Sequence, residues 1–545
     1  MKTNVSLCIA AALMVAACGD PSHRHNSGKK VSVINSEPDE VIEEDVEITS
    51  DEAALMEPSA NATSKMILSS PLQQRNAETY KEIKENSFVA VAQQPVTTFS
   101  ADVDRAAYAN VRRIIGYGQI PPKDAVRIEE MVNYFDYDYP APEEGSASPL
   151  RVSPELAPAP WNPNHLLLRI GLQAKKIDLA KAPPSNIVFL IDVSGSMDEE
   201  NKLPLLKSSF KMLLGQLRPD DKIAIVTYAN GTKVVLPSTS VKDKEKIIKV
   251  LDNLYASGGT SGGKGIQLAY EQAQKSFIKN GNNRIILATD GDFNIGINNT
   301  TDLEKFIEKQ RESGIYMSVL GFGIGNYRDD MAETIADKGN GNYAYIDNIT
   351  EAKKVLVNEL SGTLFAVAKD VKLQLEFNPK YVKEYKLIGY ENRMLANEDF
   401  TNDKKDAGEI GAGHTVTALY ELVPSDGKVA QSLRYQSQEL NEKGKGNELG
   451  FLKIRYKDPK VKDAKSVEIT EPLVFNKKAL KETSTDYRFA ASVAEFGILL
   501  RDNSNKANAT YDQVIELAEG AIGKDPEGYR KEFVRLVKSV KMLPK

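Results

Sequence analysis

The chain has 545 residues, of which 41% are hydrophobic, and 70 Lys and Arg residues stand against 76 Asp and Glu residues, giving a net charge of −6. The length left after the N-terminal segments suffices for two or three folded domains. The negative charge and the lack of a basic cluster argue against a nucleic acid as partner. Only two cysteines occur, Cys8 and Cys18, and Cys8 lies in the first apolar stretch, so no disulfide framework is expected.

The first residues predict a secretory signal. Lys2 precedes an apolar stretch from Val5 to Ala17 that is too short to cross a bilayer as a helix. The stretch ends Val15-Ala-Ala-Cys18-Gly, which resembles a bacterial lipobox. We therefore expect residues 1–17 to be a signal peptide and Cys18 to carry a lipid after cleavage. An ordinary secretory signal with an unrelated cysteine is the alternative.

Residues 18–94 have the composition of a tether. From Glu37 to Glu57 acidic residues dominate without one Lys or Arg, and Ser, Asn, Pro and Gln surround them. Such a segment buries too little apolar surface to offset the entropy lost on ordering. The composition predicts a disordered acidic tether that holds the folded part away from a membrane. An acidic interaction tail is the other interpretation.

Residues 95–185 combine helices with at least one strand. Apolar residues recur at helical spacing between Thr98 and Tyr139, and Leu166–Leu172 alternates as a half-buried strand does. If this strand joins the strands that follow residue 366, the segment between them is inserted into a discontinuous β domain.

Residues 186–365 alternate buried strands with amphipathic helices. This order predicts an α/β fold, a doubly wound and mostly parallel sheet with helices on both faces. The expected strands are Ile187–Ile191, Ile223–Thr227, Ile285–Ala288 and Tyr316–Gly321.

Three strand-to-loop junctions in this segment carry oxygen-bearing side chains. Asp192, Ser194 and Ser196 follow the first strand, Thr260 lies in a Gly-rich loop, and Asp290 ends another strand. Ligands of open α/β sheets bind at the carboxyl ends of the strands, where these residues should meet. Carboxylate and hydroxyl oxygens suit a hard divalent cation. The pattern predicts a metal site made by these five residues.

Two other functions, nucleotide binding and enzymatic activity, have little support in the sequence. The stretch Gly258–Gly265 resembles a phosphate-binding loop, but Gly265 stands where Ser or Thr is needed, so no nucleotide is expected. The four histidines form no His-Glu-x-x-His motif, and neither His165 nor His414 accompanies a nucleophile elbow. We therefore expect no enzymatic activity.

In the last third of the chain, the spacing of the apolar residues changes twice. In residues 366–482 apolar and polar residues alternate, which predicts antiparallel strands of a β-sandwich or an open barrel. Residues 483–545 return to helical spacing, which predicts a C-terminal helical segment.

The segment with Asp192-x-Ser194-x-Ser196, Thr260 and Asp290-Gly resembles a von Willebrand factor type A (VWA) domain with a complete metal-ion-dependent adhesion site (MIDAS). That resemblance implies that the three hydroxyls bind Mg²⁺ directly and the two carboxylates act mainly through water, with Ca²⁺ or Mn²⁺ as alternative metals. The flanks are similar to the N-terminal VWF-like region and the C-terminal domain of unknown function of bacterial VWA lipoproteins.

This resemblance implies a non-enzymatic, metal-dependent protein–protein interaction module, for adhesion or as a scaffold. A partner protein would present an Asp or Glu to the metal, and the lipid on Cys18 would anchor the chain in the bacterial cell envelope. The anchor is expected in the outer membrane, with the protein on its periplasmic or surface face. The alternative is a structural envelope lipoprotein whose metal only stabilises the VWA fold. No second hydrophobic run has the length of a membrane span.

Overall fold

The computed structural model describes residues 78–101, 104–259, 262–291, 300–325, 327–426, 446–461, 464–502 and 506–544. The predicted signal peptide, Cys18 and the tether up to residue 77 lie outside these residues, as does Thr260. No helix of the described part is both long enough and apolar enough to cross a membrane.

The predicted disorder is wrong for the last part of the tether, residues 78–94. Glu78 forms an ion pair with Arg113 at 2.8 Å (Oε2 to Nη2), and Thr79 pairs with the backbone of Arg328. Strand β1 (Val89–Ala90) adds to a sheet edge. The acidic composition that predicted disorder ends at Glu57, whereas residues 78–94 have specific ion-pair and backbone partners that composition does not reveal.

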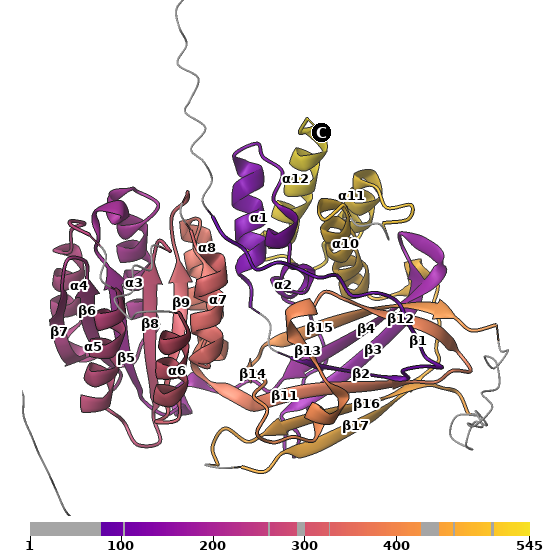
Figure 1. Cartoon of the computed structure of the whole chain (residues 1–545), viewed down its shortest axis with the longest axis horizontal. Helices are drawn as coiled ribbons and strands as arrows, with labels where there is room; N and C mark the ends of the chain where they lie inside the picture. Colours follow the sequence, from indigo (N-terminus) through magenta and orange to yellow (C-terminus); the bar gives the residue numbers. More distant parts are fainter. Residues whose placement is uncertain are drawn as a thin grey trace, which may run out of the picture. The chain divides into compact units, whose positions relative to one another are not determined.

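The central segment forms one six-stranded sheet (Figure 1) in the order β10-β9-β8-β5-β6-β7, and its inner strands are parallel as predicted. The edge strand β7 is antiparallel to β6. The four predicted strands are confirmed, whereas β7 and β10 were not predicted. The strands are β5 (Ser185–Asp192), β6 (Lys222–Tyr228), β7 (Thr232–Ser240), β8 (Asn282–Thr289), β9 (Ile315–Gly321) and β10 (Tyr343–Tyr345).

Helices cover both faces of this sheet, which explains why its central strands are apolar along their whole length. Helices α3, α4, α8 and α9 pack on one face, and α5, α6 and α7 pack on the other together with α1. The helices are α1 (Ala106–Gly116), α3 (Leu203–Gln216), α4 (Lys244–Asp252), α5 (Gly262–Lys275), α6 (Thr300–Arg311), α7 (Asp329–Lys338), α8 (Ile349–Lys353) and α9 (Leu360–Leu364).

The flanking strands form a β-sandwich of two sheets, in the orders β1-β12-β15-β4-β3 and β13-β2-β11-β16-β17, with β14 paired to β11. Because β4 lies before the VWA segment and pairs with β15 beyond it, the VWA segment is inserted into this sandwich. The alternation of Leu166–Leu172 predicted the strand, and the insertion follows from its pairing, which the sequence left open. Thus the strands from residues 95–185 and from residues 366–482 share one core. The strands are β2 (Val96–Ser100), β3 (Leu150–Ala159), β4 (Asn162–Ala174), β11 (Ala366–Phe377), β12 (Val382–Ile388), β13 (Met394–Leu395), β14 (Gly408–Gly411), β15 (Thr415–Pro424), β16 (Glu448–Lys457) and β17 (Val467–Val474).

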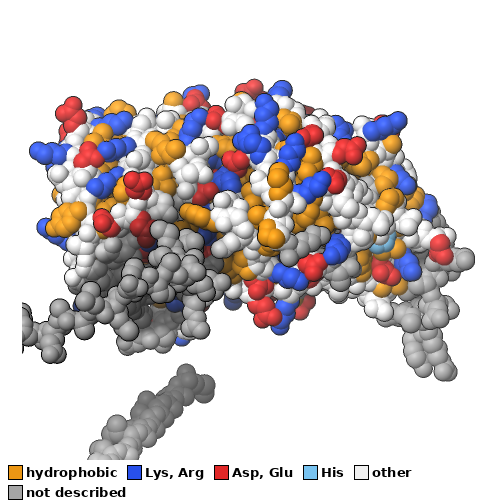
Figure 2. Space-filling view, turned by 90° about the horizontal axis from the view of Figure 1, so that it is seen from above, with side chains coloured by type: hydrophobic (Ala, Val, Ile, Leu, Met, Phe, Trp, Pro, Cys, Tyr) orange, Lys and Arg blue, Asp and Glu red, His pale blue; other side chains and the backbone are white. Residues whose placement is uncertain are grey.

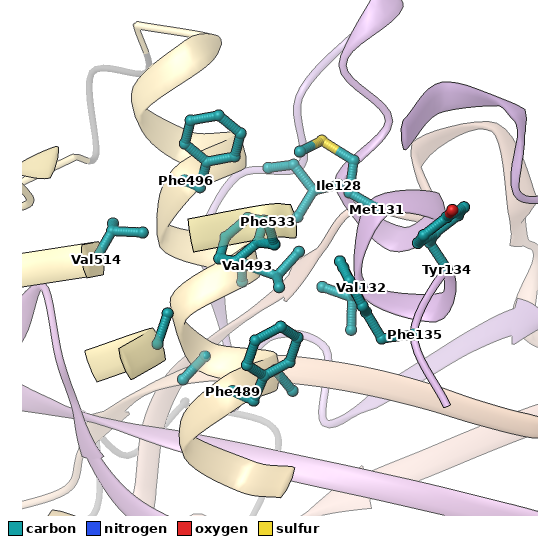
Figure 3. Close-up of a cluster of buried hydrophobic side chains, with 14 of the residues drawn as sticks. Ile128, Met131, Val132, Tyr134, Phe135, Phe489, Val493, Phe496, Val514 and Phe533 are labelled. Atoms are coloured by element: carbon teal, nitrogen blue, oxygen red, sulfur yellow. The ribbon is translucent and has the colours of Figure 1, made fainter. Parts of the chain in front are cut away.

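The C-terminal helices pack around a second N-terminal helix, α2 (Ile128–Asn133), in one apolar cluster (Figure 3). Phe135 contacts Phe489 and Phe533 edge to face, with ring centroids 4.9 and 5.7 Å apart. The only tryptophan of the chain, Trp161, is fully buried in the same cluster, as a packing residue should be. The predicted C-terminal helices are confirmed as α10 (Thr485–Leu500), α11 (Tyr511–Glu519) and α12 (Tyr529–Met542).

A buried ion-pair network joins the N-terminal helices to the VWA segment. Arg127 contacts the Asp329 carboxylate at 2.5 Å (Nη1 to Oδ2) and also pairs with Glu130. Tyr343 and Asn110 donate hydrogen bonds to the same Asp329 carboxylate. All of these side chains are buried, so each charge depends on its partners in place of water. On the face drawn in Figure 2, by contrast, exposed charges of both signs are interspersed.

Candidate metal-binding site

The first part of the site is the end of the central strand β5. Its eight residues are all buried, and it pairs with β6 and β8 in parallel. The run of Ile, Val, Phe and Leu suits a strand covered on both faces, and the chain then delivers Asp192 at the carboxyl edge of the sheet. The Asp192 side chain is fully buried.

The turn after β5 brings two hydroxyls together. The Ser194 amide donates a hydrogen bond to Asp192 Oδ1 at 2.9 Å, an arrangement typical of Asp in turns. The hydroxyl oxygens of Ser194 and Ser196 lie 3.1 Å apart. Three of the five predicted ligands, Asp192, Ser194 and Ser196, therefore share one turn and lie side by side.

A second loop is fixed against this turn just before Thr260. The Gly195 amide donates to the Gly258 carbonyl at 2.8 Å, and the Ser257 amide donates to the Val193 carbonyl at 2.8 Å. Gly258 has a positive φ of 78°, and a Cβ there would lie 2.2 Å from Asn230 Nδ2, so glycine is required. The described part of this loop, up to Gly259, therefore lies against the turn, and the predicted ligand Thr260 lies outside the described residues.

The third part is Asp290, directly after β8. Its Oδ2 lies 3.3 Å from the ammonium of Lys202, which also donates to the Ser196 carbonyl at 2.8 Å. Lys202 therefore links the Asp290 carboxylate to the turn that carries the serines. The side chain of Lys202 is buried, and its stem passes so close to Gly323 that a Cβ there would lie 2.3 Å from it.

Lys202 was missed by the sequence analysis. It lies just before α3, where a lysine is indistinguishable in the sequence from a solvated one. Only the fold shows that its ammonium points at the predicted metal ligands.

The electrostatics of the site favour a cation. Asp192 Oδ2 is buried and has no hydrogen-bond partner of good geometry among the described residues, although the Tyr228 hydroxyl lies near the carboxylate. Burial raises the pKa of Asp192 to about 7, against the lowering effect of Ser194, and the negative charge of Asp290 raises it further. A buried carboxylate with a second carboxylate nearby is stabilised by a positive ion.

These residues fit a hard divalent cation. The buried Asp192 oxygen, the paired serine hydroxyls and the Asp290 carboxylate are all oxygen ligands. The described residues contain no group of three or more His, Cys, Asp or Glu side chains that could hold a metal without hydroxyl ligands. Asp192, Ser194, Ser196 and Asp290, with Thr260 from the adjacent loop, are the residues that would bind the ion, and this assignment stays a prediction.

Three sequence families match this chain. Residues 74–169 match the family described as von Willebrand factor, residues 186–358 match the von Willebrand factor type A domain, and residues 362–543 match "Uncharacterized protein YfbK, C-terminal". The matches to the VWA family and to the flanking regions confirm the predicted resemblance.

Two relatives and one solved structure extend this comparison. The "Uncharacterized protein YfbK" of Escherichia coli K12 is 48% identical over 465 residues, which cover 84% of this chain and 80% of that protein. The "Uncharacterized protein sll0103" of Synechocystis is 26% identical over 326 residues, covering 60% of this chain and 74% of that protein. A von Willebrand factor type A structure from Catenulispora acidiphila is 14% identical, covers 84% of this chain and 91% of its own, and superposes with a TM-score of 0.39.

Proposed function

Because the chain belongs to the YfbK family of bacterial VWA proteins, we propose that its VWA domain binds a partner protein in a metal-dependent manner. One observation carries this proposal: the buried Asp192 carboxylate has an oxygen without a well-formed hydrogen bond to a described residue, beside two adjacent hydroxyls at the carboxyl edge of the sheet. A divalent cation bound there, Mg²⁺ in our proposal with Ca²⁺ or Mn²⁺ as alternatives, supplies a positive site for an Asp or Glu of the partner.

The residues of the chain set how strongly such a site attracts a carboxylate. The two serines contribute oxygen without charge, and Lys202 compensates part of the charge of Asp290. The low total negative charge keeps the site electropositive once a divalent ion is bound. The proposal involves no bond making or breaking, so we propose a binding protein and not an enzyme.

An exposed aromatic residue lies in the loop beside the site. Tyr255 is 76% exposed and lies two residues before Ser257, whose amide holds the loop against Val193. Exposed tyrosines of this kind often contribute much of the binding energy in protein interfaces. We infer that Tyr255 contacts the same partner.

The test compares metal binding with partner capture. Purified protein is titrated with Mg²⁺ by calorimetry and then used to capture envelope proteins in Mg²⁺ or in EDTA. Asp192→Asn should weaken metal binding about tenfold or more and abolish metal-dependent capture. Asp198→Asn is the matched control, because Asp198 is an exposed carboxylate in the same turn. Tyr255→Ala should weaken capture and leave metal binding unchanged.

The outcomes separate the two candidate roles of the metal. Capture that needs both Mg²⁺ and Asp192 supports the proposed function. If Mg²⁺ raises the melting temperature while the captured proteins are the same in Mg²⁺, in EDTA and with Asp192→Asn, the metal is a fold cofactor and the proposal fails.

We also propose that the chain acts at the cell envelope, anchored through a lipid on Cys18 in the outer membrane. The lipobox-like sequence before Cys18 supports this. Cys18→Ser should release the protein from the membrane fraction into the soluble fraction, and mass spectrometry of the N-terminal peptide should lose the lipid mass. Unchanged membrane association of the variant would contradict the anchor.

A further inference from the structure

A polar cleft of about 350 Å³ lies between the VWA segment and strands of the β-sandwich. Its wall includes Arg284 from β8, Asn342 from the loop before β10, Thr363 from α9, Lys405 from the loop before β14, and Glu409 from β14 itself. The volume falls within the range of clefts that hold small molecules. This cleft is distinct from the metal site, because Arg284 lies near the start of β8 and Asp290 follows the end of that strand.

Arg284 is a buried cation without an ion pair: the Glu409 carboxylate acts on it electrostatically from beyond 4.0 Å, but Glu409 is itself paired with Lys369. Its side chain is only 3% exposed, and its one hydrogen bond to a described residue runs from Nη1 to Ser318 Oγ at 2.7 Å. The buried Nε has no hydrogen-bond partner, and no carboxylate of the described residues lies within 4.0 Å. The ring of Tyr316 is its other close neighbour, with Cζ 5.7 Å from the ring centroid. Burying a guanidinium in this way costs folding free energy unless an anion is bound beside it.

The other charges on the wall of the cleft differ from Arg284, because most are compensated by a partner within the protein. The compensated pairs are Asp337 with Arg393 at 2.7 Å, Asp406 with Arg311 at 2.6 Å, Lys338 with Glu308 at 2.6 Å and Glu409 with Lys369 at 3.5 Å. Lys405, exposed at the rim, has no carboxylate within 4.0 Å among the described residues. The two charges of the cleft that have no ion pair within 4.0 Å among the described residues are thus both positive.

We propose that this cleft binds the oxyanion group, a carboxylate or a phosphate, of a small polar molecule, with Arg284 as its anchor and Lys405 as a second contact at the rim. A guanidinium presents parallel N–H donors that match such a group, and two of the Arg284 nitrogens donate to no described residue. The amide of Asn342 and the hydroxyl of Thr363 lie on the same wall and can bind the uncharged part of the molecule.

The experiment uses the purified full chain in EDTA, so that the metal site does not contribute. Inorganic phosphate and succinate are the probes, and sodium chloride at equal ionic strength is the reference. Binding is measured by calorimetry and by the shift of the melting temperature. One probe or both should raise the melting temperature above the chloride value, and which of them does so distinguishes phosphate from carboxylate.

Substitutions then locate the site. Arg284→Met should weaken binding about tenfold or more, because it removes charge-assisted hydrogen bonds. Without ligand its melting temperature should equal or exceed that of the wild type, since an uncompensated buried charge has been removed. Lys338→Met is the matched control: it removes the same charge from the same wall, but Lys338 is already paired with Glu308, so binding should persist.

Lys405→Met provides a second variant that leaves the core intact, because Lys405 is exposed, and it should weaken binding several-fold. The proposal is overturned if neither probe exceeds the effect of chloride. It is also overturned if Arg284→Met and Lys405→Met bind as the wild type does, or if Arg284→Met lowers the melting temperature without ligand as a structural residue would. None of these outcomes depends on the metal-dependent binding proposed above.

Discussion

Glu495 should make the stability of the helical cluster depend on pH. This residue of α10 is fully buried, and neither carboxylate oxygen has a hydrogen-bond partner of good geometry among the described residues. Burial raises its pKa from 4.5 to about 8, against a smaller lowering effect of the Thr510 backbone amide. At pH 7 the folded protein therefore keeps a proton that the unfolded chain releases.

The sign and size of the effect follow from that difference. The contribution of Glu495 to stability is fully present below pH 4.5 and falls as the pH rises toward 8, because only the unfolded state ionises in this window. Each rise of one pH unit lowers the free energy of unfolding by about 1.4 kcal/mol, so roughly 3 kcal/mol of stability should be lost between pH 4.5 and pH 7. Glu495→Met conserves the volume and removes the titrating group, and it should stabilise the protein by an amount that grows with pH.

The assay is urea unfolding at a series of pH values between 4.5 and 8. The fluorescence of the only tryptophan, Trp161, reports on the same apolar cluster that contains α10. Glu516→Met on the neighbouring helix α11 is the control, because Glu516 is exposed. The unfolding free energies of wild type and Glu495→Met should diverge as the pH rises. Parallel curves would refute the reasoning.

Two further substitutions test buried charges elsewhere. Lys202→Met should raise the affinity for Mg²⁺ about tenfold, measured by calorimetry, because the ammonium 3.3 Å from Asp290 opposes a second cation there; weaker binding would mean that Lys202 mainly positions the ligands. Arg127→Met should lower the free energy of unfolding by about 3–5 kcal/mol, since Asp329 is left buried without its partner. Lys181→Met is the control and should lower the free energy of unfolding by less than about 1 kcal/mol, because Lys181 is exposed and lies 3.8 Å from its carboxylate partner. Equal losses of stability for Arg127→Met and Lys181→Met would contradict this account.

The sequence predicted the elements whose pattern is local. Continuous apolar runs marked the inner strands of the VWA sheet, and the alternation in Leu166–Leu172 marked a strand of the sandwich. The two-residue spacing of Asp192, Ser194 and Ser196 placed three oxygens in one turn, as the structure shows. Each of these features depends on neighbours in the sequence, so each could be derived without knowing the fold.

Features that depend on distant residues could not be derived in this way. Lys202 reaches Asp290 across 88 positions of the chain, and the unpaired state of Arg284 is a property of the cleft, since its residue type alone predicts only a charged surface position. The order of residues 78–94 depends on contacts such as Glu78 with Arg113 and on the pairing of β1 with β12. The short edge strand β10 has three residues, too few for a periodic pattern to be detected.

One strand, β8, connects the proposed metal site with the proposed oxyanion cleft. Arg284 is its third residue and Asp290 follows its last residue, so the two side chains lie roughly 20 Å apart along the strand. The residues between them are buried and paired on both sides with β5 and β9, which leaves the strand little freedom to move by itself. Any influence of one ligand on the other must therefore involve a displacement of the whole sheet or of its covering helices. Otherwise the two sites bind independently, each with its own charge balance.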